Sequence, residues 1–423
     1  MSISGRASGA AGQALKFPRR SDPADSAAAV LLRLGLFVLF VVTPAIGVFS
    51  RRGILIAAPA GIVLLLLSAA LAGGFARAAR GVGEALASPG GVAACLFFFW
   101  AFLSLLWSPV PGQSVERLAR ITLTGLIAAL ACHSLPERAR ATNLYLLPVG
   151  SAAAALLALG ASFLGQLPSA AADSDQPTLE RALAGASVCA FAGVAWLAAR
   201  NRNMLAMALA SILLAAAIFL QVTPAMLAIA AGAVVLGGSA YRPPETARAL
   251  GWIAAALVLA APLIALAAGG LSGSLSLSNP ELAKPWTVWA RTLWDEPLRS
   301  LTGRGLDTSF RHKLTGELDN AAPQGLLFMV WYELGLIGAA SFAVALGMAA
   351  RACGQLGLVV APFALGAMAA AFVYAMLGVG VFQPWWLTAL SIAAIGFACV
   401  RSGLYRTSRP EASLFPGRRP SGA

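Results

Sequence analysis

The sequence has few ionisable residues and almost no histidine. Only 11% of its 423 residues are charged, compared with about 25% in a typical soluble domain. Two residues are histidines, and none of the five cysteines belongs to a CxxC pair, so the pattern indicates neither a zinc site nor a disulfide framework. A Walker loop, an HExxH helix, a GxSxG elbow and a dinucleotide fingerprint are also missing. We therefore expect no metal and no cofactor.

Long polar stretches are scarce too, because hydrophobic residues make up 59% of the chain. A helix that crosses a bilayer needs about 20 mostly apolar residues. Twelve segments meet this need approximately, at 27–49, 53–75, 90–109, 116–133, 143–166, 182–199, 203–221, 223–239, 249–270, 324–350, 357–380 and 384–400. The pattern predicts an all-α, polytopic integral membrane protein with about twelve transmembrane helices.

A single long polar segment, residues 270–323, interrupts these apolar stretches. The transmembrane domain is expected at 27–400, with a disordered tail at 1–26 and a basic tail at 401–423. Arginines gather in alternate connections and in both tails, which is the distribution expected of cytoplasmic segments. This predicts a multi-pass protein with both termini in the cytoplasm and the 270–323 loop outside. The net charge of +13 follows this distribution and suggests no nucleic-acid partner.

Arginines also occur on the expected external side. Arg181 begins a span after an acidic stretch, and Arg291 and Arg304 lie in the long loop. A guanidinium group binds phosphate through two parallel hydrogen bonds and keeps its charge in partly dry sites. These three arginines are candidate ligands of a pyrophosphate, although solvated loop charges would have the same pattern. His312, the only histidine of this loop, is a candidate for proton transfer.

Three of the ten tryptophans fall within nine residues of the loop. Trp286 and Trp289 could stack on sugar rings, or their helix could lie on the bilayer surface as aromatic belts do. The sequence leaves both interpretations open.

The order of several short motifs resembles the O-antigen ligase family, which shares its fold with Wzy-type O-antigen polymerases and exopolysaccharide polymerases. The matching segments are 100–109 (WAFLSLLWSP) with Ser114 and Arg117, 179–182 (LERA), 289–307 (WARTLWDEPLRSLTGRGLD) and 331–338 (WYELGLIG). The resemblance covers most of the chain in layout and is specific over about 289–338.

The resemblance implies a metal-independent glycosyltransferase of cell-surface polysaccharide biosynthesis in the bacterial cytoplasmic (inner) membrane. Its donor would be an undecaprenyl-pyrophosphate-linked oligosaccharide, and its acceptor another saccharide or lipid A-core. Arg181 matches the family's first pyrophosphate-binding arginine. The family's histidine, which helps to activate the acceptor hydroxyl, is replaced here by Gln324, and its second arginine by Pro285.

These two replacements leave several functions open. Glutamine can orient a hydroxyl but cannot act as a base near neutral pH. The site could be rearranged around His312, Arg291 or Arg304, with Gln324 as an orienting group. The chain could also be a non-catalytic relative that assists polysaccharide assembly. A transporter with twelve helices is a third possibility, although the two halves of the sequence show no repeat.

Overall fold

The computed structural model describes residues 23–136, 141–164, 176–274, 280–379 and 383–404, and every regular element in these ranges is a helix. The helices are α1 (Pro23–Phe37), α2 (Thr43–Phe49), α3 (Arg51–Leu71), α4 (Phe75–Ala87), α5 (Pro89–Leu103), α6 (Pro111–Ser134), α7 (Ala141–Leu144), α8 (Leu146–Phe163), α9 (Gln176–Ala199), α10 (Asn203–Phe219), α11 (Thr223–Tyr241), α12 (Pro243–Ser274), α13 (Pro280–Asp295), α14 (Arg299–Thr302), α15 (Thr308–Thr315), α16 (Leu326–Gly354), α17 (Ala361–Met376) and α18 (Pro384–Gly403). A π-helical turn (Val38–Val42) joins α1 to α2, and a 3₁₀ turn (Ser104–Trp107) ends α5.

All twelve expected spans correspond to helices, and nine of the described helical segments are long and apolar enough to cross a membrane. The other three are α10 and α17, with 17 and 16 residues, and α6, which carries charged residues near its start. The structure is thus that of a polytopic helical membrane protein.

The expected boundaries of the two tails differ from the structure. Helix α1 begins at Pro23, inside the segment 1–26 that was expected to be disordered, because the alanine-rich stretch that follows is already helical. Helix α18 continues to Gly403, three residues into the predicted basic tail. Residues 1–22 and 405–423, the remainder of both predicted tails, lie outside the described part of the chain.

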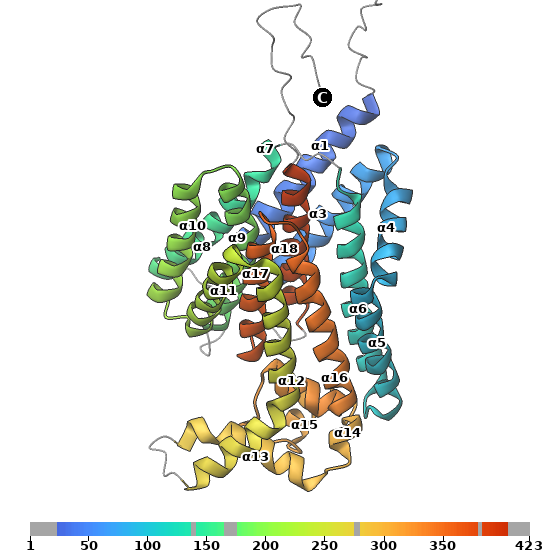
Figure 1. The fold of residues 1–423 in the computed structure, drawn as a ribbon, viewed down its shortest axis with the longest axis vertical. Helices are drawn as coiled ribbons and strands as arrows, with labels where there is room; N and C mark the ends of the chain where they lie inside the picture. The colour runs from blue at the N-terminus through green and yellow to red at the C-terminus, as the bar shows by residue number, and fades with distance from the viewer. Residues whose placement is uncertain (1–22, 137–140, 165–175, 275–279, 380–382, 405–423) are drawn as a thin grey trace, which may run out of the picture.

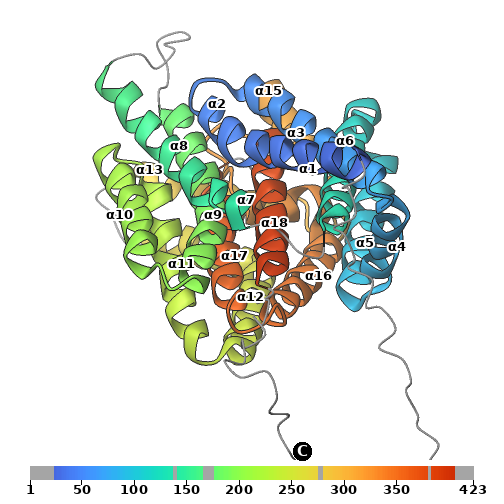
Figure 2. The same cartoon turned by 90° about the horizontal axis from the view of Figure 1, so that it is seen from above.

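The helices form one elongated bundle (Figure 1). Helix α1 begins and α18 ends at the upper end of this view, whereas α13, α14 and α15 lie at the lower end. We call these the terminal end and the loop end. Seen from the terminal end, α18 lies near the centre, with α8 to α11 on one side and α4 to α6 on the other (Figure 2).

Small residues bring the helices of this bundle close together, as is usual in membranes, where lipid is as apolar as the helix surfaces. Gly150 of α8 is the clearest example, since a Cβ atom there would lie 1.6 Å from the carbonyl oxygen of Phe40. The surrounding core contains Leu36, Leu147 and the fully buried Trp196.

The predicted 270–323 loop is largely helical. Helix α12 continues to Ser274, and α13, α14 and α15 follow; residues 275–279 lie outside the described part. Helix α13 has one buried face, where Trp289 is only 3% exposed and packs edge-on against Phe328 of α16. This packing ties the helical layer to the transmembrane bundle.

Candidate functional site

The helix α16 is interrupted at Gly335, which has φ of 65° and ψ of −162°. An interruption leaves the carbonyl groups of the preceding turn without their usual amide donors. Three groups from elsewhere in the chain replace them: the Arg304 amide donates to the Tyr332 carbonyl (3.0 Å) and the Gly305 amide to that of Glu333 (2.9 Å). The Trp100 indole donates to the Leu334 carbonyl at 2.9 Å. A broken helix at membrane depth is tolerated for this reason.

The close approach of the loop to this break requires glycine. A Cβ atom on Gly303, which has φ of +77°, would lie 2.2 Å from the Glu333 carbonyl oxygen. A Cβ on Gly335 would lie 2.5 Å from the Gly303 nitrogen. The GRG sequence at 303–305 is thus explained by backbone contact with α16.

A second set of contacts fixes the end of this loop segment to α6. The Ser108 and Ser114 hydroxyls both donate to the Leu306 carbonyl, at 3.0 and 2.8 Å. Arg117 forms an ion pair with Asp307, and each side chain is about one-fifth exposed. The WSP, GRGLD and ELGLIG motifs, distant in sequence, therefore meet at one place in the structure.

Directly beside this junction, five side chains make what we call the His312 cluster: Glu296, Arg304, His312, Glu317 and Tyr332. Nδ1 of His312 lies 2.6 Å from the Tyr332 hydroxyl, and Nε2 lies 3.1 Å from Oε2 of Glu317. The guanidinium of Arg304 lies over the Tyr332 ring, 4.5 Å from its centroid, and 3.3 Å from Glu296. The cluster thus joins a histidine to an arginine through one tyrosine.

The charged groups of this cluster differ in exposure. The side chains of His312 and Arg304 are 18% and 14% exposed, whereas Glu317 and Glu296 are 62% and 54% exposed. The carboxylates therefore lie on the solvent side of His312 and Arg304. An anionic ligand arriving from solvent could replace them without disturbing the buried packing.

Burial lowers the pKa of His312 from its ordinary value of 6.5. Glu317 opposes this shift by raising the pKa, Arg304 lowers it, and Glu296 raises it. The shift favours the neutral ring at neutral pH. In the Nδ1–H tautomer the ring donates to the Tyr332 oxygen and presents a lone pair at Nε2, as a general base requires. In the other tautomer Nε2 donates to Glu317.

Glu333 lies within α16 beside the same junction and is 1% exposed. Its Oε1 accepts a hydrogen bond of 2.5 Å from the Ser309 hydroxyl. Its Oε2 is buried and has no hydrogen-bond partner among the described residues. The side chain holds the start of α15 against α16, and solvent does not reach it.

Arg181 is not part of the His312 cluster. It lies near the start of α9 in a small cavity of about 30 Å³ that α2, α3, α9 and α18 line. Trp385, at the start of α18, lines the same cavity. Helix α18 ends at the terminal end (Figure 1), so its start, and Arg181 beside it, lie at the opposite end of that helix. Its Nε is buried without a hydrogen-bond partner in the described chain, and Arg51 is close enough to act on it electrostatically.

The remaining candidates lie at separate places. Arg291 is exposed on α13. Trp286 is 37% exposed and stacks on the buried Trp289, with ring centroids 6.2 Å apart. Trp289 is enclosed by this stack and by Phe328, so our expectation that it could stack on a sugar is wrong, while Trp286 keeps an exposed part.

Gln324 is exposed just before α16, where its backbone lies against Gly378 after α17. No hydrogen bond joins it to His312 within the described part of the chain. Their neighbours are in contact, however, because the Lys313 ammonium donates to the Ala322 carbonyl at 2.6 Å.

No protein-family model and no curated protein matches this chain. The resemblance carried by the motifs is accordingly a hypothesis about function. Within the described ranges, no three His, Cys, Asp or Glu side chains are grouped so that they could hold a metal ion.

Sequence reasoning overlooked Tyr332, Glu296, Glu317 and Glu333. Tyr332 and Glu333 had a usable signal, since they are polar residues in an apolar segment, which are costly at membrane depth and tend to mark sites. Glu296 and Glu317 had none, because acidic residues are ordinary in an exposed segment.

Proposed function

We propose that this protein is a glycan transferase of the O-antigen ligase or polymerase type. It would take a saccharide from an undecaprenyl-pyrophosphate-linked donor and pass it to a saccharide or lipid A-core acceptor. The site would lie at the loop end, on the outer face of the bacterial cytoplasmic membrane. The observation that carries this proposal is the His312 cluster. It combines a histidine whose lowered pKa favours the neutral ring with Arg304, whose side chain is only 14% exposed.

In this proposal, the acceptor hydroxyl replaces the Glu317 carboxylate at Nε2 of His312. Its oxygen attacks C1 of the donor sugar and forms the new glycosidic bond, while the proton passes to Nε2. The bond between C1 and the pyrophosphate oxygen breaks, and its electron pair leaves with the lipid pyrophosphate. With Glu317 displaced from Nε2, the ring can carry its proton on Nδ1 and donate it to the Tyr332 hydroxyl, which leaves the lone pair at Nε2.

The negative charge that develops on the leaving pyrophosphate needs fixed donors. Arg304 supplies a guanidinium next to His312, and Glu296 would give up its place to phosphate oxygens. Arg181 supports the same role, because a buried, unpartnered donor beside a second arginine is stabilised by an anion. Gln324 would orient the acceptor, and the exposed part of Trp286 would contact a sugar. Arg291, which is exposed on α13, would add positive charge at the edge of the proposed site.

Transfer by the purified protein tests this proposal. The protein in nanodiscs would receive an undecaprenyl-pyrophosphate-linked oligosaccharide and an acceptor glycan, and both the product and the released lipid pyrophosphate would be measured. We expect His312→Ala to abolish transfer, and Gln324→His to preserve or raise it. Thr315→Ala, an exposed change on the same helix α15, is the matched control and should leave transfer unchanged. Normal transfer by His312→Ala would remove the histidine from the chemistry.

A non-catalytic member of the same family is the second candidate. It is favoured by Gln324 and by the two contacts that occupy both ring nitrogens of His312. This candidate predicts no turnover by the purified protein, together with accumulated lipid-linked intermediate in a deletion strain. In that case neither the His312 nor the Gln324 variant would change the surface polysaccharide.

A further inference from the structure

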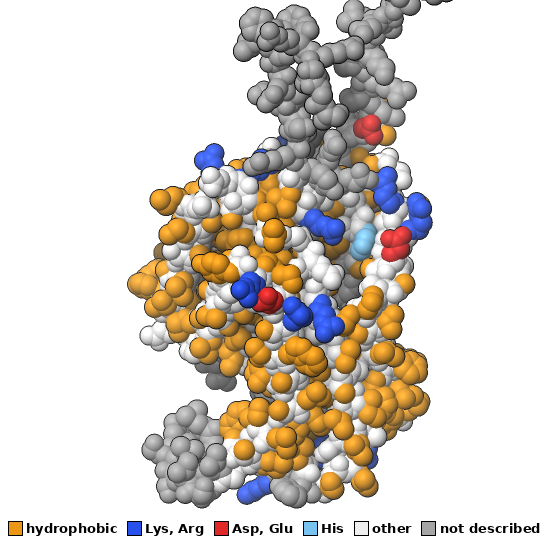
Figure 3. Space-filling view, in the orientation of Figure 1, with side chains coloured by type: hydrophobic (Ala, Val, Ile, Leu, Met, Phe, Trp, Pro, Cys, Tyr) orange, Lys and Arg blue, Asp and Glu red, His pale blue; other side chains and the backbone are white. Residues whose placement is uncertain are grey.

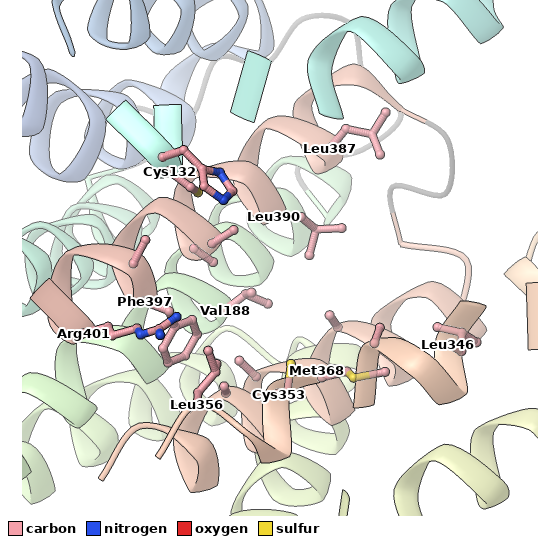
Figure 4. Close-up of a pocket in the computed structure, with 18 of the residues that line it drawn as sticks. Cys132, Val188, Leu346, Cys353, Leu356, Met368, Leu387, Leu390, Phe397 and Arg401 are labelled. Atoms are coloured by element: carbon pink, nitrogen blue, oxygen red, sulfur yellow. The ribbon is translucent and has the colours of Figure 1, made fainter. Parts of the chain in front are cut away.

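The largest cavity among those described runs between the helices, from Leu326 and Trp386 at the starts of α16 and α18 to Arg401 near the end of α18. Its volume is about 1070 Å³, and residues of α4, α5, α6, α9, α16, α17 and α18 line it. Most of the lining is apolar: Leu346, Leu390, Phe397 and Met368 surround the space, as Figure 4 shows. A cavity of this size with a mostly apolar lining suits an apolar ligand.

One end of this cavity is basic. Arg77 and Arg80 of α4 and Arg401 of α18 line it together with His133, against one carboxylate, that of Glu84. Arg80 and Arg401 are exposed. Because α18 ends here, this rim lies toward the terminal end, opposite the His312 cluster, and basic side chains gather on the upper part of the face in Figure 3.

A second hollow adjoins the rim. Its volume is about 660 Å³, and it shares Arg77, His133 and Leu135 with the large cavity. Its other lining residues include Asn143, Thr142 and Ser134, which can hydrogen-bond. The apolar cavity therefore borders a more polar one, which also contains Asp25 and Arg33.

We propose that this cavity binds one anionic glycerophospholipid of the surrounding membrane. Its acyl chains would fill the space lined by Leu346, Leu390 and Phe397, and its phosphate would lie between Arg80 and Arg401. Basic pockets between transmembrane helices, on the side of the positive loops, hold anionic headgroups in this way. The rim lies at the end opposite the proposed donor site, so the headgroup of this lipid would be held apart from the pyrophosphate of the lipid-linked substrate, whereas the apolar space itself reaches Leu326 and Trp386.

Native mass spectrometry of the full chain tests the proposal. The protein would be released from nanodiscs that contain equal amounts of phosphatidylglycerol and phosphatidylcholine. We expect one retained phosphatidylglycerol. In Arg80→Gln/Arg401→Gln its affinity should fall about fivefold for each arginine removed, which corresponds to about 1 kcal/mol each. Arg202→Gln is the matched control, since Arg202 is exposed between α9 and α10, and it should retain the lipid.

A cavity-filling variant addresses the apolar part. Ala394→Phe places a ring in the cavity, because Ala394 lines it, and should remove the retained lipid. Ala230→Phe, an exposed site on α11, should not. If Ala394→Phe fails to fold, lipid retention by the Arg80→Gln/Arg401→Gln variant still tests the proposal. Equal retention of both phospholipids in the wild type, unchanged retention in the arginine variant, or a polyprenyl phosphate as the bound species would each overturn the proposal. All of these outcomes are measured as the mass of the retained lipid, so none of them depends on transfer activity.

Discussion

His312 contacts a hydroxyl through one ring nitrogen and a carboxylate through the other, so its protonation controls the cluster. Burial lowers its pKa below the ordinary 6.5. A base must be neutral, and we therefore expect kcat/KM to be steady at neutral pH and to fall only below pH 6.5. Tyr332→Phe removes the contact with Nδ1 and should lower kcat more than it raises KM. An activity that rises as the pH falls below 6.5 would contradict this assignment.

The same shift in pKa links His312 to stability. A histidine whose pKa is lower in the folded state is protonated more readily when unfolded. The folded state therefore keeps its full stability above pH 6.5 and loses part of it as the pH falls from 6.5 through the lowered pKa. We expect the Tm of wild-type protein in detergent to drop over this window more than that of His312→Asn. Parallel curves for the two proteins would show that burial of the ring has no such cost.

Arg181 offers a different test, because lysine and arginine differ in geometry and both carry a positive charge. If the guanidinium grips pyrophosphate, Arg181→Lys should impair transfer as Arg181→Ala does, since an ammonium group cannot make the paired contact. The expected loss is about 2–4 kcal/mol of transition-state stabilisation, roughly 30–1000-fold in rate. Full activity of both variants, at normal protein levels, would place Arg181 outside the site.

At the scale of the element, the interruption of α16 gives a sharp stability prediction. Gly335 has a positive φ, and a Cβ atom would collide with backbone atoms of Leu301 and Gly303. Gly335→Ala should destabilise the protein by at least about 1–3 kcal/mol. Gly347→Ala, later in the same helix, meets open space and should be neutral or stabilising by up to about 1 kcal/mol. Thermal unfolding in detergent, followed by size-exclusion chromatography, compares the two; equal Tm values would refute the strain argument.

The transmembrane helices were predictable from sequence because lipid demands long apolar stretches, and each expected span corresponds to a helix. The helical character of 280–315 was harder to see. Its apolar residues, such as Trp289, lie on one face and alternate with exposed ones such as Arg291. The mean hydropathy of the segment therefore resembles that of a polar loop. The interruption at Gly335 was also hidden, since glycine is common in membrane helices and only the contact with Gly303 explains it.

The candidate site was only partly predictable for a related reason. His312 and Arg304 are rare residue types in one polar segment, and the structure places them in one cluster. Their link, Tyr332, belongs to another element, and the chain folding that brings it near is not encoded in local spacing. Gln324 and Arg181 were chosen by resemblance in sequence order, which does not specify how far apart residues lie in space.

At the scale of the whole molecule, the position of the two ends predicts topology. Helix α1 begins and α18 ends at the terminal end, while α13 to α15 lie at the other (Figure 1). A reporter inserted after Gly316, where a Cβ would meet open space, should therefore read as external. A second reporter after Leu404 should read as cytoplasmic, as the arginine-rich connections require. Cytoplasmic signals from both fusions would refute the proposed location of the site.

The interruption of α16 also determines which part of this chain can be exchanged as a module. The backbone of 303–305 completes the hydrogen bonding of Tyr332 and Glu333, so neither segment is satisfied alone. A chimera that replaces only 280–323 would break these bonds, whereas one that replaces 280–334 would carry them along. Recombination between related proteins, natural or designed, should therefore place its crossover at Gly335. This position is inside the helix α16 and not at residue 323, where the loop ends in the sequence.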